Sequence, residues 1–234
     1  MILDKYSKKF IHYYIEEIPA GIEDEFSRIS AKNMMDLGSG DGAILFALFK
    51  RGYLKGLDKV IAVDISSSRL SNVKKIDNKF LCVASDACKL ALSDNAAIDF
   101  IIANQVIEHV ADEDVFIKEI HRVLSTNGVV YLSTVFKKKY GWYFYRCNGK
   151  WVLDPTHVRE YTQAEPLLSL LKKNNFEILK DTKQLFWFPV MDFIIKRINP
   201  NRAVYKNSVF KSLRKIKIPI IGYYNWQLIL RKTN

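Results

Sequence analysis

Residues 34–46 read MMDLGSGDGAILF, in which apolar residues flank an acid and three glycines within five positions. Glycines spaced in this way occur where a backbone comes close to a ligand or to another segment, because glycine lacks a Cβ atom and readily adopts positive φ. The stretch predicts a strand, a tight turn and the start of a helix, where polar ligands bind. The glycines alone do not identify the ligand, since Gly38, Gly40 and Ala43 also satisfy the dinucleotide pattern G-x-G-x-x-A.

Short apolar runs alternate with helical patterns on both sides of this turn. We expect strands at 33–37, 59–64, 79–84, 98–104, 128–135 and 176–182, and helices at 42–51, 66–75, 113–124 and 164–173. The stretch IIGYYNWQLILRK near the end predicts one more strand. Strand–helix alternation is typical of βαβ units with right-handed crossovers and a parallel sheet. The sequence therefore predicts an α/β fold with helices on both faces of the sheet.

We expect residues 1–234 to form a single domain, because the chain has no internal repeat and no low-complexity linker. Residues 1–30 have helical spacing, broken near Pro19, and are expected to form an N-terminal helical cap. Two aromatic and basic stretches, 137–160 and 184–217, have no clear period. They are expected to be irregular insertions that together form a substrate cap.

The composition is that of a globular protein, with 49% hydrophobic and 26% charged residues. Three cysteines without CxxC or Cys/His spacing are expected to be reduced thiols, as in a cytoplasmic protein. The first residues have no continuous apolar run, so we expect no signal peptide. No uncharged apolar run approaches the ~18 residues that would cross a bilayer.

The positive charge is concentrated late in the chain. The net charge is +11, and nine Lys/Arg against one acid, Asp192, lie between Lys183 and Lys217. An apolar run at 185–195 followed by a basic tail is typical of a segment in peripheral contact with an anionic membrane. Aromatic and basic residues together also suit RNA, which we expect less. A cap packed on the sheet, or a solvated basic face, explains the stretch equally well.

Three acids follow consecutive predicted strands. Asp36 ends the first strand, where a carboxylate suits a ligand with an ammonium group and would repel a pyrophosphate. Asp64 ends the second strand and can accept both hydroxyls of a ribose. Asp86 follows the third strand, where it can accept from an adenine amino group while the N–H of Ala87 faces a ring nitrogen. Single acids of this kind are commonly caps, but the three together predict an adenosyl ligand that carries an ammonium group.

Several ordered motifs resemble those of class I S-adenosylmethionine-dependent methyltransferases. The motifs are DLGSGDG, VDIS, SDA, ANQVIEHV and HRVLSTNGVVYLST, and they cover about residues 30–135. They are most similar to the type 11 and 12 families, which act on small molecules, lipids and glycans. The resemblance implies a Rossmann-like three-layer sandwich with a seven-stranded, mostly parallel sheet and an antiparallel last strand.

The resemblance also implies S-adenosylmethionine as the cofactor and places it along the strand ends. The implied contacts are Asp36, Gly38, Ser39 and Gly40 at the methionine end, Asp64 with Ile65 at the ribose, Asp86 and Ala87 at the adenine, and Asn104 and Gln105 near the sulfonium. A methyl group on a sulfonium is already activated, so the protein mainly has to align the acceptor and exclude water. A base is required only when the acceptor carries a proton that must be removed.

Glu108 and His109 follow the fourth predicted strand, near the expected position of the methyl group. In similar quinone-pathway O-methyltransferases and small-RNA 2′-O-methyltransferases, a Glu-x-x-Glu-His arrangement here binds a divalent metal. This chain has Gln105 in the first position, and an amide is a poorer ligand than a carboxylate for such ions. We therefore expect no metal, and His109 is either a general base or a structural cap of the loop.

The stretch DPTHVREYT at 154–162 supplies a second candidate, His157, as base, substrate contact or ligand. A similar histidine before a helix faces the active site in small-molecule, lipid and glycan methyltransferases. The alternative is a histidine that only orders the loop. Thr162 is expected to cap the helix that follows. The aromatic residues between Trp142 and Trp151 are expected to form either a lid over the acceptor or a minor core.

The sequence therefore predicts a methyltransferase that O-methylates a small molecule, a lipid or a lipid-linked glycan, with Glu108, His109 and His157 as candidate catalytic residues. An RNA methyltransferase is the first alternative, although no NPPY-like motif follows the fourth strand. A methyltransferase-like binding module without activity is the second. A dehydrogenase is disfavoured, because Asp36 and Asp86 would then have no role.

Overall fold

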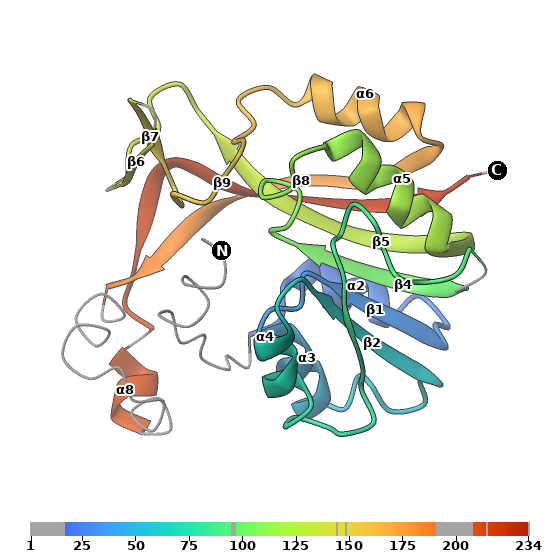
Figure 1. The fold of residues 1–234 in the computed structure, drawn as a ribbon. Coiled ribbons are helices and arrows are strands. Elements are labelled where there is room, and N and C mark those ends of the chain that lie inside the picture. The colour runs from blue at the N-terminus through green and yellow to red at the C-terminus, as the bar shows by residue number, and fades with distance from the viewer. Residues whose placement is uncertain are drawn as a thin grey trace.

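The computed structural model describes residues 17–94, 97–143, 145–147, 149–190, 208–213 and 215–233. Seven strands form one sheet in the order β3-β2-β1-β4-β5-β9-β8 (Figure 1). The strands are β1 (Asn33–Leu37), β2 (Lys59–Asp64), β3 (Leu81–Ala84), β4 (Ile98–Asn104), β5 (Leu124–Lys137), β8 (Phe176–Pro189) and β9 (Lys217–Lys232). The helices are α2 (Ala20–Phe26), α3 (Ala43–Lys50), α4 (Ser67–Val73), α5 (Glu113–Val123), α6 (Glu165–Lys173) and α8 (Ser208–Leu213).

The direction of the strands confirms the predicted sheet. Strand β1 pairs in parallel with β2 and β4, and the pairs β2–β3 and β4–β5 are also parallel. The last strand, β9, runs antiparallel to both of its neighbours, β5 and β8. The chain therefore has the seven-stranded Rossmann-like sheet in which only the last strand is reversed.

Two apolar cores lie on opposite faces of the sheet, which makes the fold a three-layer sandwich. Neighbouring residues of β1 point to opposite faces, so that Met34 belongs to one core and Met35 to the other. Helices α5 and α6 cover the core of Met35, and α2, α3 and α4 cover that of Met34 (Figure 1). Both faces are buried, which explains why the parallel strands read as continuous apolar runs.

The expected insertion at 184–217 is partly regular, which corrects the prediction. Strand β8 continues to Pro189 and pairs with the start of β9, with Trp187 opposite Pro219 and Phe188 opposite Ile218. The ladder shifts its register between Leu185 and Trp187, which interrupts the alternation that a strand prediction relies on. Residues 191–207 lie outside the described residues.

The expected insertion at 137–160 contains a short hairpin of β6 (Tyr145–Cys147) and β7 (Lys150–Val152). At the N-terminal cap, α2 begins directly after Pro19, as the predicted break requires, and residues 1–16 lie outside the described part. The capping prediction at Thr162 is wrong, since α6 begins at Glu165 with Ala164 as its N-cap. In the described part of the chain, each helix is too short or too polar to cross a membrane.

Candidate functional site

The glycine turn after β1 approaches other parts of the protein closely. Gly38, Gly40 and Gly42 all have positive φ, at 74°, 55° and 82°. A Cβ atom at Gly38 would lie 2.5 Å from a methyl group of Val106, in the segment after β4. At Gly40 the nearest atom to such a Cβ is 3.4 Å away, on Arg69. Gly38 is therefore required by the fold itself, whereas the surroundings of Gly40 are more open.

Asp64, at the end of β2, holds this turn in shape. Its Oδ2 accepts a hydrogen bond from the N–H of Gly40, and its Oδ1 accepts one from the N–H of Ser66, both at 2.9 Å. Each carboxylate oxygen has a second lone pair, so both oxygens can still accept from a ligand hydroxyl. No local sequence pattern indicates this structural role of Asp64. The neighbouring Ile65 is exposed.

Asp36 ends the adjacent strand β1 and is 2% exposed. Burial, and then the charge of Asp64, raises the pKa of Asp36 to about 7. When burial and a like charge raise the pKa of a carboxyl group, a cation that binds beside the group favours its ionised form. Ser39 supplies a second polar group here, because its buried hydroxyl has no hydrogen-bond partner among the described residues. This end of the turn thus has the donors and acceptors to receive an ammonium and carboxylate pair.

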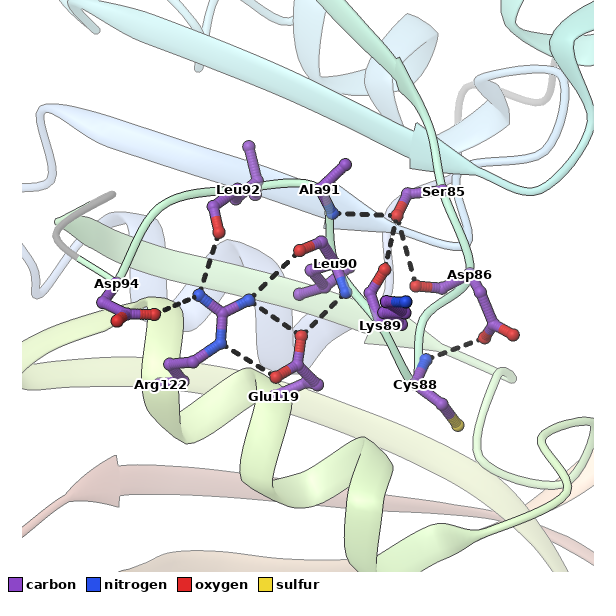
Figure 2. A network of polar contacts seen from close by, with 10 residues as sticks. All are labelled: Ser85, Asp86, Cys88, Lys89, Leu90, Ala91, Leu92, Asp94, Glu119 and Arg122. Carbon is purple, nitrogen blue, oxygen red and sulfur yellow. Dashed lines mark hydrogen bonds and ion pairs between the residues drawn. The ribbon is translucent and has the colours of Figure 1, made fainter.

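Asp86 lies in a loop after β3 that is held from two sides (Figure 2). Its Oδ1 accepts a hydrogen bond of 2.8 Å from the N–H of Cys88, and the side chain remains exposed. Farther along the loop, Arg122 of α5 donates to the carbonyls of Leu90 and Leu92. These contacts fix the loop that carries Asp86 and Ala87. No local sequence pattern predicts the contacts, because Arg122 is far from the loop in sequence.

Asn104 ends β4 and Gln105 follows it, beside the glycine turn. The side chain of Asn104 accepts from the Ser133 hydroxyl at 2.7 Å. Gln105 has a φ of 57°, which is uncommon for a residue other than glycine and is found often at functional sites. Its amide nitrogen donates to Asn225 at 3.0 Å. The Gln105 side chain is therefore held against β9 by a direct hydrogen bond.

Glu108 is completely buried and only partly hydrogen-bonded. Its Oε2 accepts from the hydroxyl of Thr134 at 3.0 Å, whereas Oε1 has no partner in the described part of the chain. Burial raises the pKa of Glu108 to about 7. An unpaired buried carboxylate oxygen is costly, so this atom either carries a proton or accepts from a bound group.

His109 and His157, distant in sequence, meet beside Glu108. Their rings pack edge to face with centroids 4.9 Å apart. The Nδ1 of His109 lies 3.3 Å from the carbonyl oxygen of Thr156. Burial, and then the neighbouring His157, lowers the pKa of His109. His109 is therefore neutral at pH 7, with a lone pair that can take up a proton.

The orientation of His157 is set by Glu160. The Nδ1 of His157 lies 3.1 Å from the Glu160 carboxylate, which also accepts from the N–H of Leu153 at 2.6 Å. Lys137 lies 3.8 Å from the other carboxylate oxygen. When Nδ1 donates to this carboxylate, Nε2 remains an acceptor. The same loop is tied to the β4–α5 segment by the N–H of Val158, which donates to the Glu108 carbonyl at 2.8 Å. The contact between His157 and Glu160 lies within this loop, so His157 can also help to order it.

Glu108, His109 and His157 also form a candidate set of metal ligands, with one ligand atom of each within 4.8 Å of the others. One carboxylate and two imidazoles suit a divalent ion such as zinc or iron. Gln105 stands where similar enzymes have the first carboxylate of the metal site, and its side chain donates a hydrogen bond to Asn225. The spacing in the sequence does not predict this set, because His157 is distant in the chain and only the tertiary structure brings it next to Glu108 and His109. The absence of a metal stays a prediction.

Aromatic residues in and just before the β6–β7 hairpin meet those of β8 and β9. Tyr143 packs against Tyr223 and Phe188, at 6.4 and 6.5 Å between centroids. Trp142 packs against Trp151 at 5.7 Å, and the Tyr223 hydroxyl donates to the carbonyl of Trp151. The aromatic stretch therefore forms a small cluster, while Trp142 remains half exposed. Phe144 lies outside the described residues.

Comparison with known proteins identifies the family. The sequence family described as "Methyltransferase domain" matches residues 35–132. A ubiquinone biosynthesis O-methyltransferase of Pelagibacter ubique is 29% identical over 185 residues, which are 73% of this chain and 72% of that protein. Residues 35–132 are thus the domain of a class I S-adenosylmethionine-dependent methyltransferase. The family uses S-adenosylmethionine as its cofactor, and this methyltransferase has the strand-end acids and the glycine turn expected of it.

Other relatives are also methyltransferases by name, and a solved structure shows the same fold. A ubiquinone biosynthesis O-methyltransferase of Rickettsia prowazekii is 26% identical and covers 74% of this chain and 69% of that protein. A Mycobacterium tuberculosis protein named a probable S-adenosylmethionine-dependent methyltransferase is 30% identical, over 62% of this chain but only 48% of its own length. The YcgJ protein of Bacillus subtilis has the same fold, with a TM-score of 0.60, 17% identity, and coverage of 92% of this chain and 97% of that one.

Proposed function

We propose that this methyltransferase transfers a methyl group to a hydroxyl oxygen of a small molecule, a lipid or a lipid-linked glycan. The observation that carries the proposal is the half-buried pair of His109 and His157, beside buried Glu108, at the edge of the sheet where the cofactor is expected. A neutral histidine suits an acceptor that must lose a proton, as a hydroxyl does. The names of the Pelagibacter and Rickettsia relatives, which specify O-methyl transfer, support the same reaction class.

The proposed cofactor site follows the strand ends described above. Asp36 faces the ammonium group, and the buried hydroxyl of Ser39 meets the same end of the ligand. Asp64 keeps acceptor capacity for the ribose, and Asp86 with Ala87 receives the adenine. Asn104 and Gln105 line the site near the methyl group. When bound, S-adenosylmethionine supplies a methyl group that its sulfonium already activates.

In the proposed mechanism, His157 and His109 act on the acceptor hydroxyl. The contact with Glu160 leaves Nε2 of His157 as an acceptor, and His109 is neutral at pH 7. One of the two rings takes the proton of the acceptor hydroxyl, and the imidazolium that forms is positively charged. Glu108 stabilises that positive charge when it is ionised. The aromatic cluster around Tyr143 and Trp151 excludes water from the acceptor.

The binding of S-adenosylmethionine is expected to weaken as the pH falls. Its ammonium group pairs with ionised Asp36, and the pKa of Asp36 is raised to about 7. Protonation of Asp36 below that value removes the pairing, so the Kd rises about ten-fold from about pH 7.5 to about pH 5.5. Calorimetric titration across this range measures the change.

Asp36→Asn is the matched variant for this test. It binds the cofactor more weakly at high pH and has a nearly flat pH profile, because the amide does not titrate. A wild-type Kd that stays constant over the range, with the fold intact by circular dichroism, contradicts the assignment of Asp36.

A metal-assisted role is the second candidate for the same cluster, favoured by the proximity of its three ligand atoms. Glu108, His109 and His157 would hold the ion, which would polarise an acceptor oxygen as a Lewis acid. The Oε1 of Glu108, which has no partner among the described residues, fits this donor set. Chelation separates the two roles, as described in the Discussion.

The acceptor class is tested with S-adenosylmethionine that carries a deuterated methyl group. The full chain is incubated with separate metabolite, lipid and RNA fractions, and mass spectrometry locates the label. We expect labelled O-methyl groups in the metabolite or lipid fraction. Label in RNA alone would indicate the RNA methyltransferase. Tight cofactor binding without label in any fraction would indicate a module without activity.

A further inference from the structure

Strands β8 and β9 extend beyond the edge of the main sheet as a two-stranded arm (Figure 1). Strand β5 ends at Lys137, opposite Tyr223, whereas β8 and β9 continue to pair with each other as far as Pro189 and Lys217. We call residues 185–190 and 215–221 the arm tip. It lies past the carboxyl end of β5, on the side of the sheet that holds the candidate site.

The arm tip exposes large apolar side chains on both of its faces. Trp187 is 53% exposed, and Ile216, Ile218 and Ile221 are 57%, 50% and 68% exposed. Trp187 lies opposite Pro219 on one face, whereas Ile218 lies on the other face. Ile221 lies in the irregular stretch between the paired residues Pro219 and Tyr224. Exposed apolar groups gathered in this way mark an interaction surface. A partner that covers both faces of a narrow arm must surround it.

The charge around the arm tip is positive. Neither 185–190 nor 215–221 contains an acid, and the second of these segments carries Lys215 and Lys217. Lys217 pairs with Glu17, at 3.1 Å, and Lys215 is exposed. An apolar tip with a basic surround complements a surface that is apolar inside and anionic outside.

We propose that the arm tip docks end-on into an anionic membrane surface, with Trp187 and the isoleucines among the lipid chains and the lysines at the headgroups. Isoleucine side chains have no ring to stack on nucleic-acid bases, which disfavours RNA. A second copy of the chain would bring two basic surfaces together, which disfavours a dimer. Insertion is shallow, because each strand of a two-stranded arm has an unpaired edge that has to stay hydrated.

This docking would place the candidate site against the membrane. Phe188 of the arm contacts Tyr143, and Tyr143 contacts Tyr223, whose hydroxyl donates to the carbonyl of Trp151. The arm tip is thus in direct contact, through Phe188, with the aromatic cluster around Tyr143 and Trp151. A lipid or lipid-linked acceptor would then reach the site directly from the membrane. This consequence rests on the proposed function, but the docking proposal is independent of it.

Co-sedimentation of the full chain with vesicles tests the docking. We expect binding to phosphatidylcholine vesicles that contain phosphatidylglycerol, and much weaker binding to phosphatidylcholine alone. Ile218→Thr/Ile221→Thr keeps β-branched side chains in the strand and lowers the binding about ten-fold or more, because less apolar area is buried. Lys215→Gln lowers it about five-fold. The matched control Leu81→Thr/Leu179→Thr changes exposed apolar residues elsewhere and leaves the binding unchanged.

Fluorescence quenching by lipids with brominated acyl chains supplies a second measurement that does not depend on the isoleucine variants. Trp187→Phe is expected to keep vesicle binding and to lose most of the quenching. The proposal is overturned by no binding to the anionic vesicles, by equal binding to both vesicle types, or by quenching that survives in Trp187→Phe. It is equally overturned if Ile218→Thr/Ile221→Thr abolishes a tRNA gel shift or a dimer while vesicle binding persists. None of these readouts requires methyl transfer, so they do not depend on the proposed acceptor.

Discussion

Replacing Asp64 with alanine is expected to weaken the binding of S-adenosylmethionine about 30-fold, which corresponds to about 2 kcal/mol. The proposed contact is a pair of charge-assisted hydrogen bonds to the ribose hydroxyls, and alanine removes both. The same carboxylate accepts the N–H groups of Gly40 and Ser66. The variant therefore also loosens the turn that approaches the methionine end. Isothermal titration of the folded variant with S-adenosylmethionine measures the effect.

The hydrogen bonds within the protein predict a second result for Asp64→Ala. Two backbone N–H groups lose their acceptor, and the free energy of unfolding falls by about 1–3 kcal/mol. Asp58→Ala is the matched control, because Asp58 is exposed and precedes the other end of the same strand. It is expected to leave both affinity and stability nearly unchanged. An unchanged Kd in Asp64→Ala would mean that the ribose does not bind there.

Replacing either His109 or His157 with glutamine is expected to lower kcat by about 10²–10⁴-fold, the usual contribution of a positioned base. Glutamine keeps a polar side chain of similar size but cannot take up the proton. The Kd for S-adenosylmethionine is expected to stay the same, since neither ring belongs to the proposed cofactor site. Single-turnover rates with an identified acceptor, together with calorimetry, separate the two effects.

Two controls accompany the histidine variants. His121→Gln changes a half-buried histidine at the far end of α5 and is expected to leave kcat unchanged. Treatment with a chelator is also expected to leave the wild-type rate unchanged. If chelation abolishes the activity and a divalent ion restores it, Glu108, His109 and His157 hold a metal and the acid–base assignment is wrong. If His157→Gln keeps the wild-type kcat, His157 does not act as a base and serves only to order the loop.

Three of the parallel strands were predictable to the residue, whereas β3 begins two residues later than predicted and β5 is longer at both ends than the predicted 128–135. Strands 33–37, 59–64 and 98–104 have the bounds that the sequence predicts, because apolar runs buried on both faces end where polar residues begin. The positions of Asp36 and Asp64 at strand ends follow directly from those bounds. The antiparallel half was less predictable, since β8 and β9 alternate irregularly and are exposed at one end.

The sequence by itself determined the α/β alternation, the glycine turn and the acids at consecutive strand ends, because each depends on a local pattern of a few residues. Only the tertiary structure decided that His157 joins His109 and Glu108, and that Asp64 holds the turn at Gly40. It also decided that β8 and β9 continue as an exposed arm. The physical reason is that such contacts join residues far apart in the chain. Their proximity depends on strand register and on packing across the whole sheet, and no local periodicity carries that information.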